Sequence, residues 1–420
     1  MTTSTHHFIN TFAYIYILLY NLLDILYRGE FEMSKKVLGI VAEYNPFHNG
    51  HKYHIDEAKK QVKPDITICA MSGNFVQRGE PAIFNKFSRA KTAIKNGIDI
   101  VIEIPTYFAV STAENFAYSA ISLLKNAGVT HIAFGVESDD INTLNKIADL
   151  LINEPEEYKK ELKNNLDKGL SFAVSRDNAV AKFIPNKLLK SPNNILAIEY
   201  LKAIKYFNVD IIPVPIKRIV GYYDDKIKND IASATKIREL IKNKGIYETL
   251  IPNNSIIPNQ PAFFEDFNNE FMYKLKTSTP SLLTELPDVV EGIENRIIAS
   301  ICSNDINDIL NKITTKRYTL SRIKRILISL LLDIKLSDLN ELKSNGYAEY
   351  LRILAISNVG KKHLRYISQT SSIPVITTVK KFLNTATNLQ RKMLEKDILA
   401  SNVYSLISND EYNMDFKNRL

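Results

Sequence analysis

The sequence predicts an α/β fold, in which a Rossmann-like parallel sheet covered by helices is followed by a mainly α-helical domain. Between residues 37 and 216, short runs rich in Val and Ile alternate with long amphipathic stretches. This alternation and its spacing indicate right-handed βαβ units and a parallel sheet. After about residue 255 the strand signals fade, and apolar residues recur at helical spacing. A chain of 420 residues is long enough for two or three such domains.

Five apolar runs are the expected strands of the sheet. In chain order they are VLGIVAEY (37–44), DITICAM (65–71), IDIVIEIP (98–105), THIAFGV (130–136) and VDIIPVPI (209–216). The amphipathic stretches between them, such as residues 113–128 and 191–207, are the expected helices. Residues 140–185 are expected to form a mostly helical insertion.

The region after residue 255 is expected to be helical. Apolar residues recur at helical spacing over residues 320–334, 348–356 and 387–407. One short strand is expected near IPVITTV (373–379), and a linker between IIPNQPAF (256–263) and STPSLL (278–283). The expected divisions of the chain are an N-terminal hydrophobic extension (1–32), a nucleotide-binding domain (33–254) and a helical domain (255–420).

The composition narrows the class of protein. Apolar residues make up 45% of the chain, which is ordinary for a globular protein with a sizeable core. The formal net charge of +8 suggests a polyanionic partner. Cys69 and Cys302 are the two cysteines, and neither belongs to a CxxC pair or a Cys/His cluster. We therefore expect reduced thiols, no structural zinc and a cytoplasmic location.

The first 32 residues differ from the rest of the chain. Residues 8–27 form an apolar run about as long as the roughly 20 residues of a membrane-spanning helix. Asn10, Asn21 and Asp24 interrupt this run, and burying Asp24 in lipid would cost about 3 kcal/mol. Met33 then opens a stretch that resembles a natural protein start. We interpret residues 1–32 as an extension without a role in function and expect no membrane association; a membrane anchor and a docked helix are the alternatives.

The stretch PFHNGH (46–51) falls where the first strand ends and a helix begins. An open parallel sheet binds ligands beyond the carboxyl ends of its strands, where helix N-termini offer unpaired N–H groups. His48 and His51 can each donate a hydrogen bond to phosphate oxygens, and Gly50 lets a flat base approach the backbone. We therefore expect a nucleoside triphosphate over this helix end. A metal ion held by imidazoles, with His54 as the third, is the alternative.

A second motif lies in IASATKIREL (231–240), where Ser233 and Thr235 open a helix and Arg238 follows one turn later. Hydroxyl groups and an arginine at a helix N-terminus suit the β- and γ-phosphates. The two motifs, in this order, resemble the HIGH and ISSTxIR signatures of the nucleotidyltransferase superfamily. Ala234 stands where that signature has its second serine, which weakens one expected phosphate contact.

Longer blocks of the chain carry a closer resemblance. They are EYNPFHNGHKYH (43–54), residues 71–105, FGVES (134–138), SPNNILAIEYL (191–201) and TTKRYTLSRIKRIL (314–327). Over residues 34–400 the chain resembles the bacterial tRNA(Met) cytidine acetate ligase family. That family activates acetate with ATP to acetyl-adenylate and acetylates N4 of the wobble cytidine of elongator tRNA(Met). The resemblance therefore implies ATP, acetate and tRNA(Met) as substrates, and it implies no protein partner.

The resemblance also implies an ATP site with His48 and His51 as catalytic residues. The implied ATP-binding residues are Val41, Ala42, Glu43, Tyr44, Asn45, Pro46, Phe47, His48, Asn49, Gly50, His51, Lys52, Tyr53, His54, Gly135, Asn193, Arg218, Ser233, Thr235 and Arg238. In the implied mechanism acetate attacks the α-phosphorus, and the cytidine amine then attacks the mixed anhydride. Mg²⁺ is expected to accompany ATP, but the sequence offers no carboxylate cage for it and no metal ligand is assigned.

The polar loop over residues 72–90 has two interpretations. It contains Gln77, Arg78, Lys86 and Arg89, and could hold acetate or the anticodon nucleotide. It could equally be a structural crossover with a solvated basic face.

Two basic stretches are the expected tRNA-binding surfaces. The residues concerned are Lys316, Arg317, Arg322 and Arg325 in the first stretch, and Lys361 and Lys362 in the second. Backbone phosphates favour such patches, although a charge run can also be a solvated helix face. Two other functions stay open: a small-molecule adenylyltransferase of the pantetheine-phosphate or nicotinamide mononucleotide type, and a non-catalytic RNA-binding module.

Overall fold

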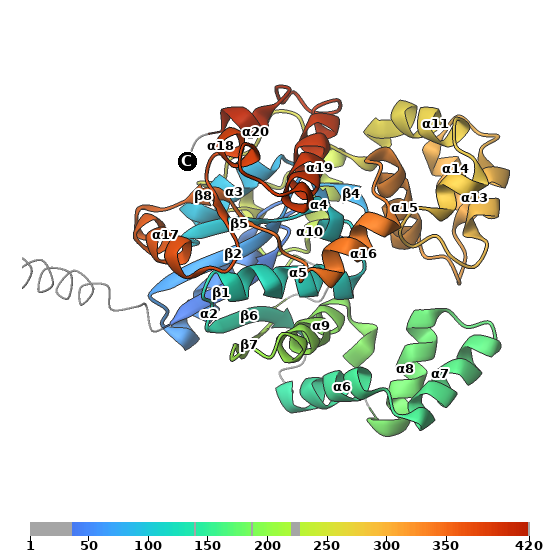
Figure 1. The fold of residues 1–420 in the computed structure, drawn as a ribbon, viewed down its shortest axis with the longest axis horizontal. Coiled ribbons are helices and arrows are strands. Elements are labelled where there is room, and N and C mark those ends of the chain that lie inside the picture. The colour runs from blue at the N-terminus through green and yellow to red at the C-terminus, as the bar shows by residue number, and fades with distance from the viewer. Residues whose placement is uncertain (1–35, 138–139, 186–187, 220–226, 419–420) are drawn as a thin grey trace, which may run out of the picture.

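The computed structural model of the chain describes residues 36–137, 140–185, 188–219 and 227–418 (Figure 1). The expectation for residues 1–32 lies outside these ranges. None of the helices within them is both long and apolar enough to cross a membrane.

A sheet in the order β7-β6-β1-β2-β5-β8-β9 is the centre of the fold. All five predicted strands are confirmed, as β1 (Val37–Ala42), β2 (Ile66–Ser72), β5 (Ile100–Ile104), β6 (His131–Val136) and β7 (Ile212–Lys217). They pair in parallel. In chain order β1, β2 and β5 extend the sheet in one direction, and β6 and β7 then extend it from β1 in the other. The order therefore reverses at β1, which is where open α/β sheets bind ligands.

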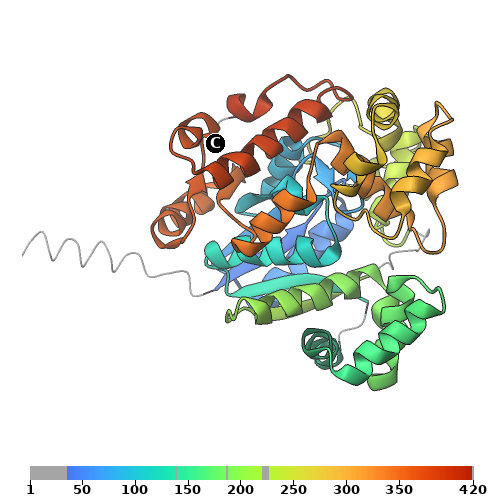
Figure 2. The ribbon, with the colours of Figure 1, turned by 45° about the vertical axis from the view of Figure 1, so that its right-hand side comes forward.

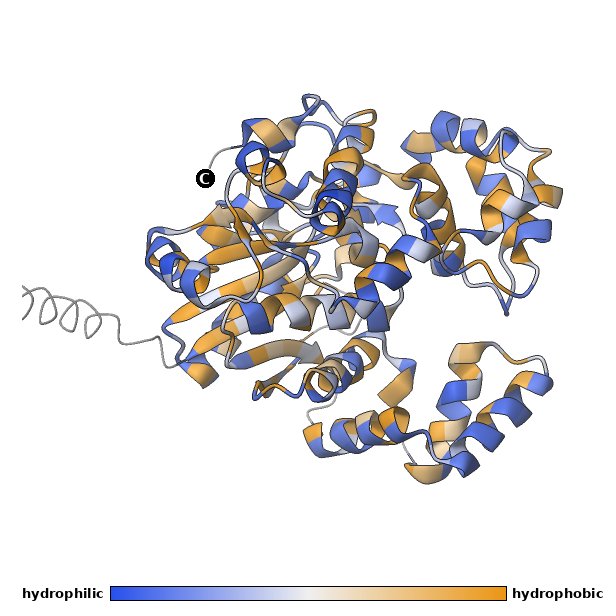
Figure 3. Ribbon diagram, in the orientation of Figure 1, coloured by the Kyte–Doolittle hydropathy of each residue, from blue (hydrophilic) through white to orange (hydrophobic). Residues whose placement is uncertain are grey.

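Helices cover both faces of the sheet, and its central strands are therefore buried on both sides. Leu38 and Ile40 of β1 pack with α2 (Asn49–Val62) and α3 (Lys86–Lys95) on one face. Ile66 and Ile68 of β2 belong to the larger core on the other face, with α5 (Ala113–Asn126) and α9 (Pro192–Tyr206). Figure 3 shows the corresponding pattern, with mostly apolar strands and helices that are polar on one side.

The prediction of a helix over residues 348–356 is wrong. Leu351–Ile356 forms strand β8, which pairs antiparallel with β5. All but the last of its residues are buried, Arg352 included, so no alternation of buried and exposed positions marks the strand, and periodicity could not separate it from a helix. The short strand expected near residues 373–379 is confirmed as β9 (Val375–Ile376). The division of the chain at residue 255 stays a prediction, although β8 and β9 complete the sheet from the region beyond it.

The rest of the C-terminal region is helical, as predicted. Its helices are α11 (Asn268–Lys276), α12 (Pro280–Thr284), α13 (Ile293–Ser300), α14 (Ile306–Ile313), α15 (Leu320–Leu331), α16 (Leu336–Ser344), α17 (Asn358–Thr370), α18 (Val379–Leu383), α19 (Asn388–Tyr404) and α20 (Met414–Lys417). The linker expected between residues 263 and 278 is wrong, because that segment forms a 3-10 helix (Phe264–Phe267) and α11 with buried Phe264 and Phe271.

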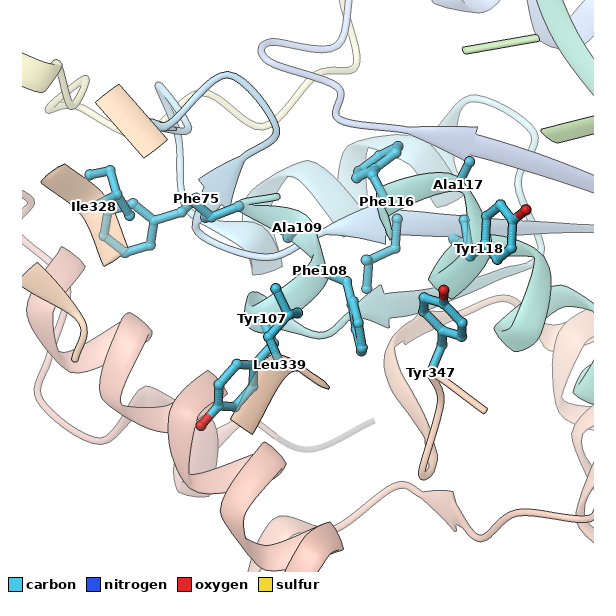
Figure 4. Packing of buried hydrophobic residues seen from close by; sticks show 14 of the residues in the cluster. Phe75, Tyr107, Phe108, Ala109, Phe116, Ala117, Tyr118, Ile328, Leu339 and Tyr347 are labelled. Carbon is cyan, nitrogen blue, oxygen red and sulfur yellow. The ribbon is translucent and has the colours of Figure 1, made fainter. Parts of the chain in front are cut away.

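One hydrophobic core joins the C-terminal helices to the sheet. Figure 4 shows Phe75 beside Ile328 of α15, and Tyr107 beside Leu339 of α16. The rings of Phe108 and Tyr347 lie 5.3 Å apart between centroids. These contacts fix the helical region against the end of the sheet.

The predicted insertion between β6 and β7 is confirmed as helical. It contains α6 (Ile141–Asn153), α7 (Glu156–Asp167) and α8 (Phe172–Phe183). Figures 1 and 2 show that this insertion and helices α11 to α15 project from the same end of the body, toward which β6 runs.

The loop over residues 72–90 is largely structural. It contains the hairpin β3 (Phe75–Val76) and β4 (Glu80–Pro81). Lys86 is buried, and its Nζ lies 2.7 Å from Glu103 Oε1 and 2.8 Å from Asp415 Oδ1. Arg89 is also buried and donates to four backbone carbonyl groups, those of Glu43, Ser72, Gly73 and Phe84. Lys86 and Arg89 therefore make contacts that hold the fold together, and neither lines the cavity described below.

Candidate functional site

The turn from β1 into α2 orients two imidazoles through a reciprocal capping box. His48 is the N-cap of α2, and its Nδ1 accepts a hydrogen bond from Gly50 N–H at 3.0 Å. His51 Nδ1 accepts in turn from His48 N–H at 3.3 Å. A neutral imidazole whose Nδ1 accepts carries its hydrogen on Nε2. Both rings therefore keep an Nε2–H donor for a ligand, and their centroids lie 3.8 Å apart.

Both imidazoles are held in the neutral form. Burial, reinforced by the nearby Arg218 and Arg238, lowers the pKa of His48 to about 3. Burial, His48 and Arg218 lower the pKa of His51 well below its usual value. The pair therefore offers hydrogen-bond donors without positive charge at physiological pH.

Gly50 is required by the neighbouring ring. A Cβ on Gly50 would lie 2.8 Å from Cε1 and 3.0 Å from Nδ1 of His48. Contacts under 3.0 Å force a displacement, so only glycine leaves the His48 ring in its capping position. The predicted role of Gly50 is to let a base approach the backbone. The contact with the His48 ring is an additional reason why this position requires glycine.

The second motif lies opposite the histidines. Ser233 caps α10 (Ala234–Lys242), and its Oγ accepts from Lys236 N–H at 3.2 Å. Arg238 Nη1 donates to Asn45 O at 2.8 Å, and Nη2 lies 3.3 Å from Thr235 Oγ1. The arginine thus connects the start of α10 to the loop that precedes α2.

The two motifs face one cavity of about 380 Å³ at the carboxyl ends of β1, β6 and β7. Sixteen of the predicted ATP-binding residues line it: Val41, Ala42, Glu43, Tyr44, Asn45, His48, Gly50, His51, Tyr53, His54, Gly135, Asn193, Arg218, Ser233, Thr235 and Arg238. Cationic and donor groups converge on it from α2, α10 and the end of β7. This arrangement suits a large anion such as a triphosphate.

Four predicted residues do not line the cavity: Pro46, Phe47, Asn49 and Lys52. Phe47 is buried in the core beneath the loop. Asn49 Nδ2 donates to the carbonyl groups of Asp230 and Thr249 at 2.9 and 2.8 Å. Lys52 is paired with Asp56 on the same helix.

Asn193 occupies the predicted place near the start of α9. Its Nδ2 donates to Glu137 Oε1 at 2.7 Å, and Asn194 Oδ1 accepts from Glu137 N–H at 3.2 Å. Glu137, which the sequence analysis did not single out, thus orients this helix start.

The opposite wall of the cavity comes from the β3–β4 hairpin and α5, with Gln77, Arg78, Ala113 and Phe116. Gln77 and Arg78 were among the loop candidates, but Ala113 and Phe116 belong to no motif and were missed. The signal available for α5 was Thr112, whose Oγ1 accepts from Asn115 N–H as an N-cap would. This N-cap signal predicts where α5 begins, but it does not predict which residues of the helix face the cavity.

The tip of the hairpin rests on α15. Gly79 has φ +75°, and a Cβ there would lie 2.3 Å from the backbone nitrogen of Arg325. Lys324 Nζ lies 2.6 Å from Glu80 Oε1. One wall of the cavity is therefore anchored to the C-terminal helices.

The two predicted basic surfaces lie at opposite ends of the molecule (Figure 1). Arg325 Nε of α15 lies 2.6 Å from Asp288 Oδ2, and Arg317 Nε, in the loop before α15, lies 3.2 Å from Glu291 Oε2. Acidic groups from a distant loop therefore offset part of this charge. Lys361 and Lys362 are exposed on α17, which begins beside Asp99, before β5. They lie on the side of the molecule where β5 begins, whereas the cavity lies at the carboxyl ends of the parallel strands.

Comparison with known proteins identifies relatives along the whole described chain. A family model described as HIGH Nucleotidyl Transferase matches residues 35–419. A Thermoanaerobacter protein named tRNA(Met) cytidine acetate ligase is 44% identical over 387 residues, which is 88% of this chain and 95% of the relative. An Acetivibrio thermocellus protein of the same name is 39% identical over 391 residues, 88% of this chain and 94% of that protein.

A crystal structure of Thermotoga maritima TmcAL bound with alpha-thio ATP has the same fold. It is 31% identical, with a TM-score of 0.85, and the match covers 91% of this chain and 98% of that one. The apo form of the Thermotoga protein gives 32% identity and a TM-score of 0.86 over the same shares.

We expect Gly50→Ala to weaken binding of a non-hydrolysable ATP analogue by roughly 10- to 100-fold, the loss of one or two hydrogen bonds to a charged group. The added methyl group displaces the His48 ring and its Nε2–H donor. Titration calorimetry measures the affinity. The control variant Gly169→Ala, in the turn after α7 and outside the cavity, meets nothing within 4 Å of its added Cβ and should bind normally. Equal affinities for both variants and the wild type would contradict the role assigned to the His48 ring.

Proposed function

The chain belongs to the HIGH nucleotidyl transferase family and, within it, to the tRNA(Met) cytidine acetate ligases, and on this basis we propose the reaction that it catalyses. It is an ATP-dependent ligase. We propose that it activates acetate as acetyl-adenylate and acetylates N4 of the wobble cytidine of elongator tRNA(Met) in the cytoplasm. The observation that carries this proposal is the pair of neutral imidazoles, His48 buried and His51 half-buried, that line the cavity at the end of β1.

In the first step an acetate oxygen attacks the α-phosphorus of ATP, and pyrophosphate leaves with the electron pair of the broken P–O bond. Negative charge builds on the phosphate oxygens in the transition state. Nε2–H of His48 and of His51 would donate to these oxygens without having to lose a proton first. The hydroxyl groups at the start of α10 and Arg238 suit the departing pyrophosphate.

In the second step the exocyclic amine of cytidine attacks the acetyl carbon of the mixed anhydride. The C–N bond forms, the C–O bond to phosphate breaks, and AMP leaves. AMP is a good leaving group because its phosphate carries the resulting charge. The two steps need no covalent bond to the protein.

Mg²⁺ would enter this site on the phosphates of ATP, and its chemistry would be to neutralise their charge. In the described part of the chain no three His, Cys, Asp or Glu side chains are grouped so that they could hold a metal ion. We therefore assign it no protein ligands and derive no step through it.

Purified protein should exchange labelled pyrophosphate into ATP only when acetate is present. His51→Ala should lower this exchange by about 10²- to 10³-fold, the usual effect of removing one transition-state donor. His131→Ala is the matched control, because His131 is the first residue of β6 and does not line the cavity, which lies at the other end of that strand. Exchange that requires another acceptor would support the small-molecule adenylyltransferase. No exchange with any acceptor would support the non-catalytic module.

We propose that the anticodon arm of tRNA contacts α15 and its preceding loop, through Lys316, Arg317, Arg322 and Arg325. The support is proximity, since this helix anchors the hairpin that forms a cavity wall. Lys361 and Lys362 would then contact a more distant part of the tRNA.

The double variant Arg317→Ala, Arg322→Ala should weaken tRNA binding and reduce its salt dependence by about one to two units of slope. Lys361→Ala, Lys362→Ala removes the same formal charge at the other end of the molecule and should have the smaller effect. Filter binding from low to moderate salt gives both quantities. A larger effect of the α17 variant would contradict the proposed orientation of the tRNA.

A further inference from the structure

Glu43 places a carboxylate in a cavity whose other charged groups suit an anion. It directly follows β1, and among the described residues that line the cavity it is the one Asp or Glu. A carboxylate repels both a triphosphate and acetate, so binding of these two anionic groups does not explain it. The side chain is also fixed, because its Oε1 accepts from Gln77 N–H at 3.0 Å. A fixed carboxylate in a cavity that suits anions indicates a role in the chemical reaction.

The second step of the proposed reaction needs a proton acceptor. The lone pair of the cytidine exocyclic amine is delocalised into the ring, so this amine is a weak nucleophile. It becomes effective when a base removes a proton as the C–N bond forms. The Nε2–H donors of the histidine pair cannot take up that proton.

The other candidate bases in the cavity are unsuitable. Nδ1 of His48 and Nδ1 of His51 already accept backbone hydrogen bonds, and their Nε2 atoms carry hydrogen. His54 is buried, and burial with the nearby Arg218 lowers its pKa to about 4, so it is a weak base. Lys217, Arg78, Arg218 and Arg238 are cationic donors.

We propose that Glu43 is the general base of acetyl transfer, an inference that rests on the proposed function. The amine attacks the acetyl carbon, the proton on N4 passes to the Glu43 carboxylate, and AMP leaves with the electrons of the broken C–O bond. The carboxyl group then returns its proton to solvent. Its Gln77 hydrogen bond holds one oxygen, which leaves the other for the amine.

The surroundings of Glu43 favour this role. Burial raises the pKa of its carboxyl group, while the Gln77 N–H bond, Arg78 and Arg238 oppose that shift and Glu80 adds to it. Tyr200 of α9 also lies within electrostatic range of the carboxyl group. A raised pKa makes the carboxylate a stronger base at neutral pH. Because the base acts when deprotonated, acetyl transfer should slow as the pH falls through this pKa.

Glu43→Gln tests the proposal, because the amide keeps the oxygen that accepts from Gln77 N–H but cannot take up a proton. Two half-reactions are measured: acetate-dependent pyrophosphate exchange, and single-turnover acetyl transfer to tRNA. We expect transfer to fall about 10²- to 10⁴-fold more than exchange does. The acidic limb of the transfer rate should vanish in this variant. Glu43→Asp should keep that limb and part of the transfer rate.

Three outcomes would overturn the proposal. Equal loss of exchange and transfer, with an unchanged unfolding midpoint, would make Glu43 a residue of ATP binding or activation. Transfer at the wild-type rate would show that it has no role in the second step. A wild-type protein without acetate-dependent exchange would instead overturn the proposed function, and the role of Glu43 with it.

Discussion

The reciprocal hydrogen bonds between the two imidazoles and the backbone at the start of α2 are the constraint on which the site depends. They fix which nitrogen of each ring carries hydrogen and aim both donors at the cavity. The order of the sheet places this helix start at the point where the topology reverses, between the ends of β1 and β6. Gly50 gives the His48 ring its space. The same few residues therefore form the sequence motif, begin the helix and supply the hydrogen-bond donors of the site.

Charge is distributed around this pair so that neutral donors and cations act together. The imidazoles stay neutral because they are buried beside Arg218 and Arg238, and these arginines supply the positive charge that a triphosphate requires. Glu43 is the exception, held by the hairpin that also contacts α15. The cavity and the candidate tRNA surface thus share one structural element, the β3–β4 hairpin.

The sequence was sufficient for the five strands and for most of the cavity, because both depend on local signals. Val- and Ile-rich runs mark buried parallel strands, and the HxGH and SxT spacing marks two helix starts. The sequence alone did not predict the contacts between residues that are far apart in the chain. Periodicity could not show that residues 351–356 are a strand, nor could a motif show that Phe116 faces the cavity. The acids that pair with Arg317 and Arg325 come from residues 288 and 291, and Lys86 meets Asp415 near the other end of the chain.

The most direct test of this account is the protonation state of the two histidines. Nitrogen NMR of protein labelled with ¹⁵N-histidine, with signals assigned through His48→Gln and His51→Gln, reports tautomer and charge between pH 5 and 8. The account predicts Nε2–H tautomers for both residues and no titration in that range, since the pKa of His48 lies at about 3 and that of His51 well below its usual value. An Nδ1–H tautomer, or titration of either ring near its ordinary pKa, would contradict it.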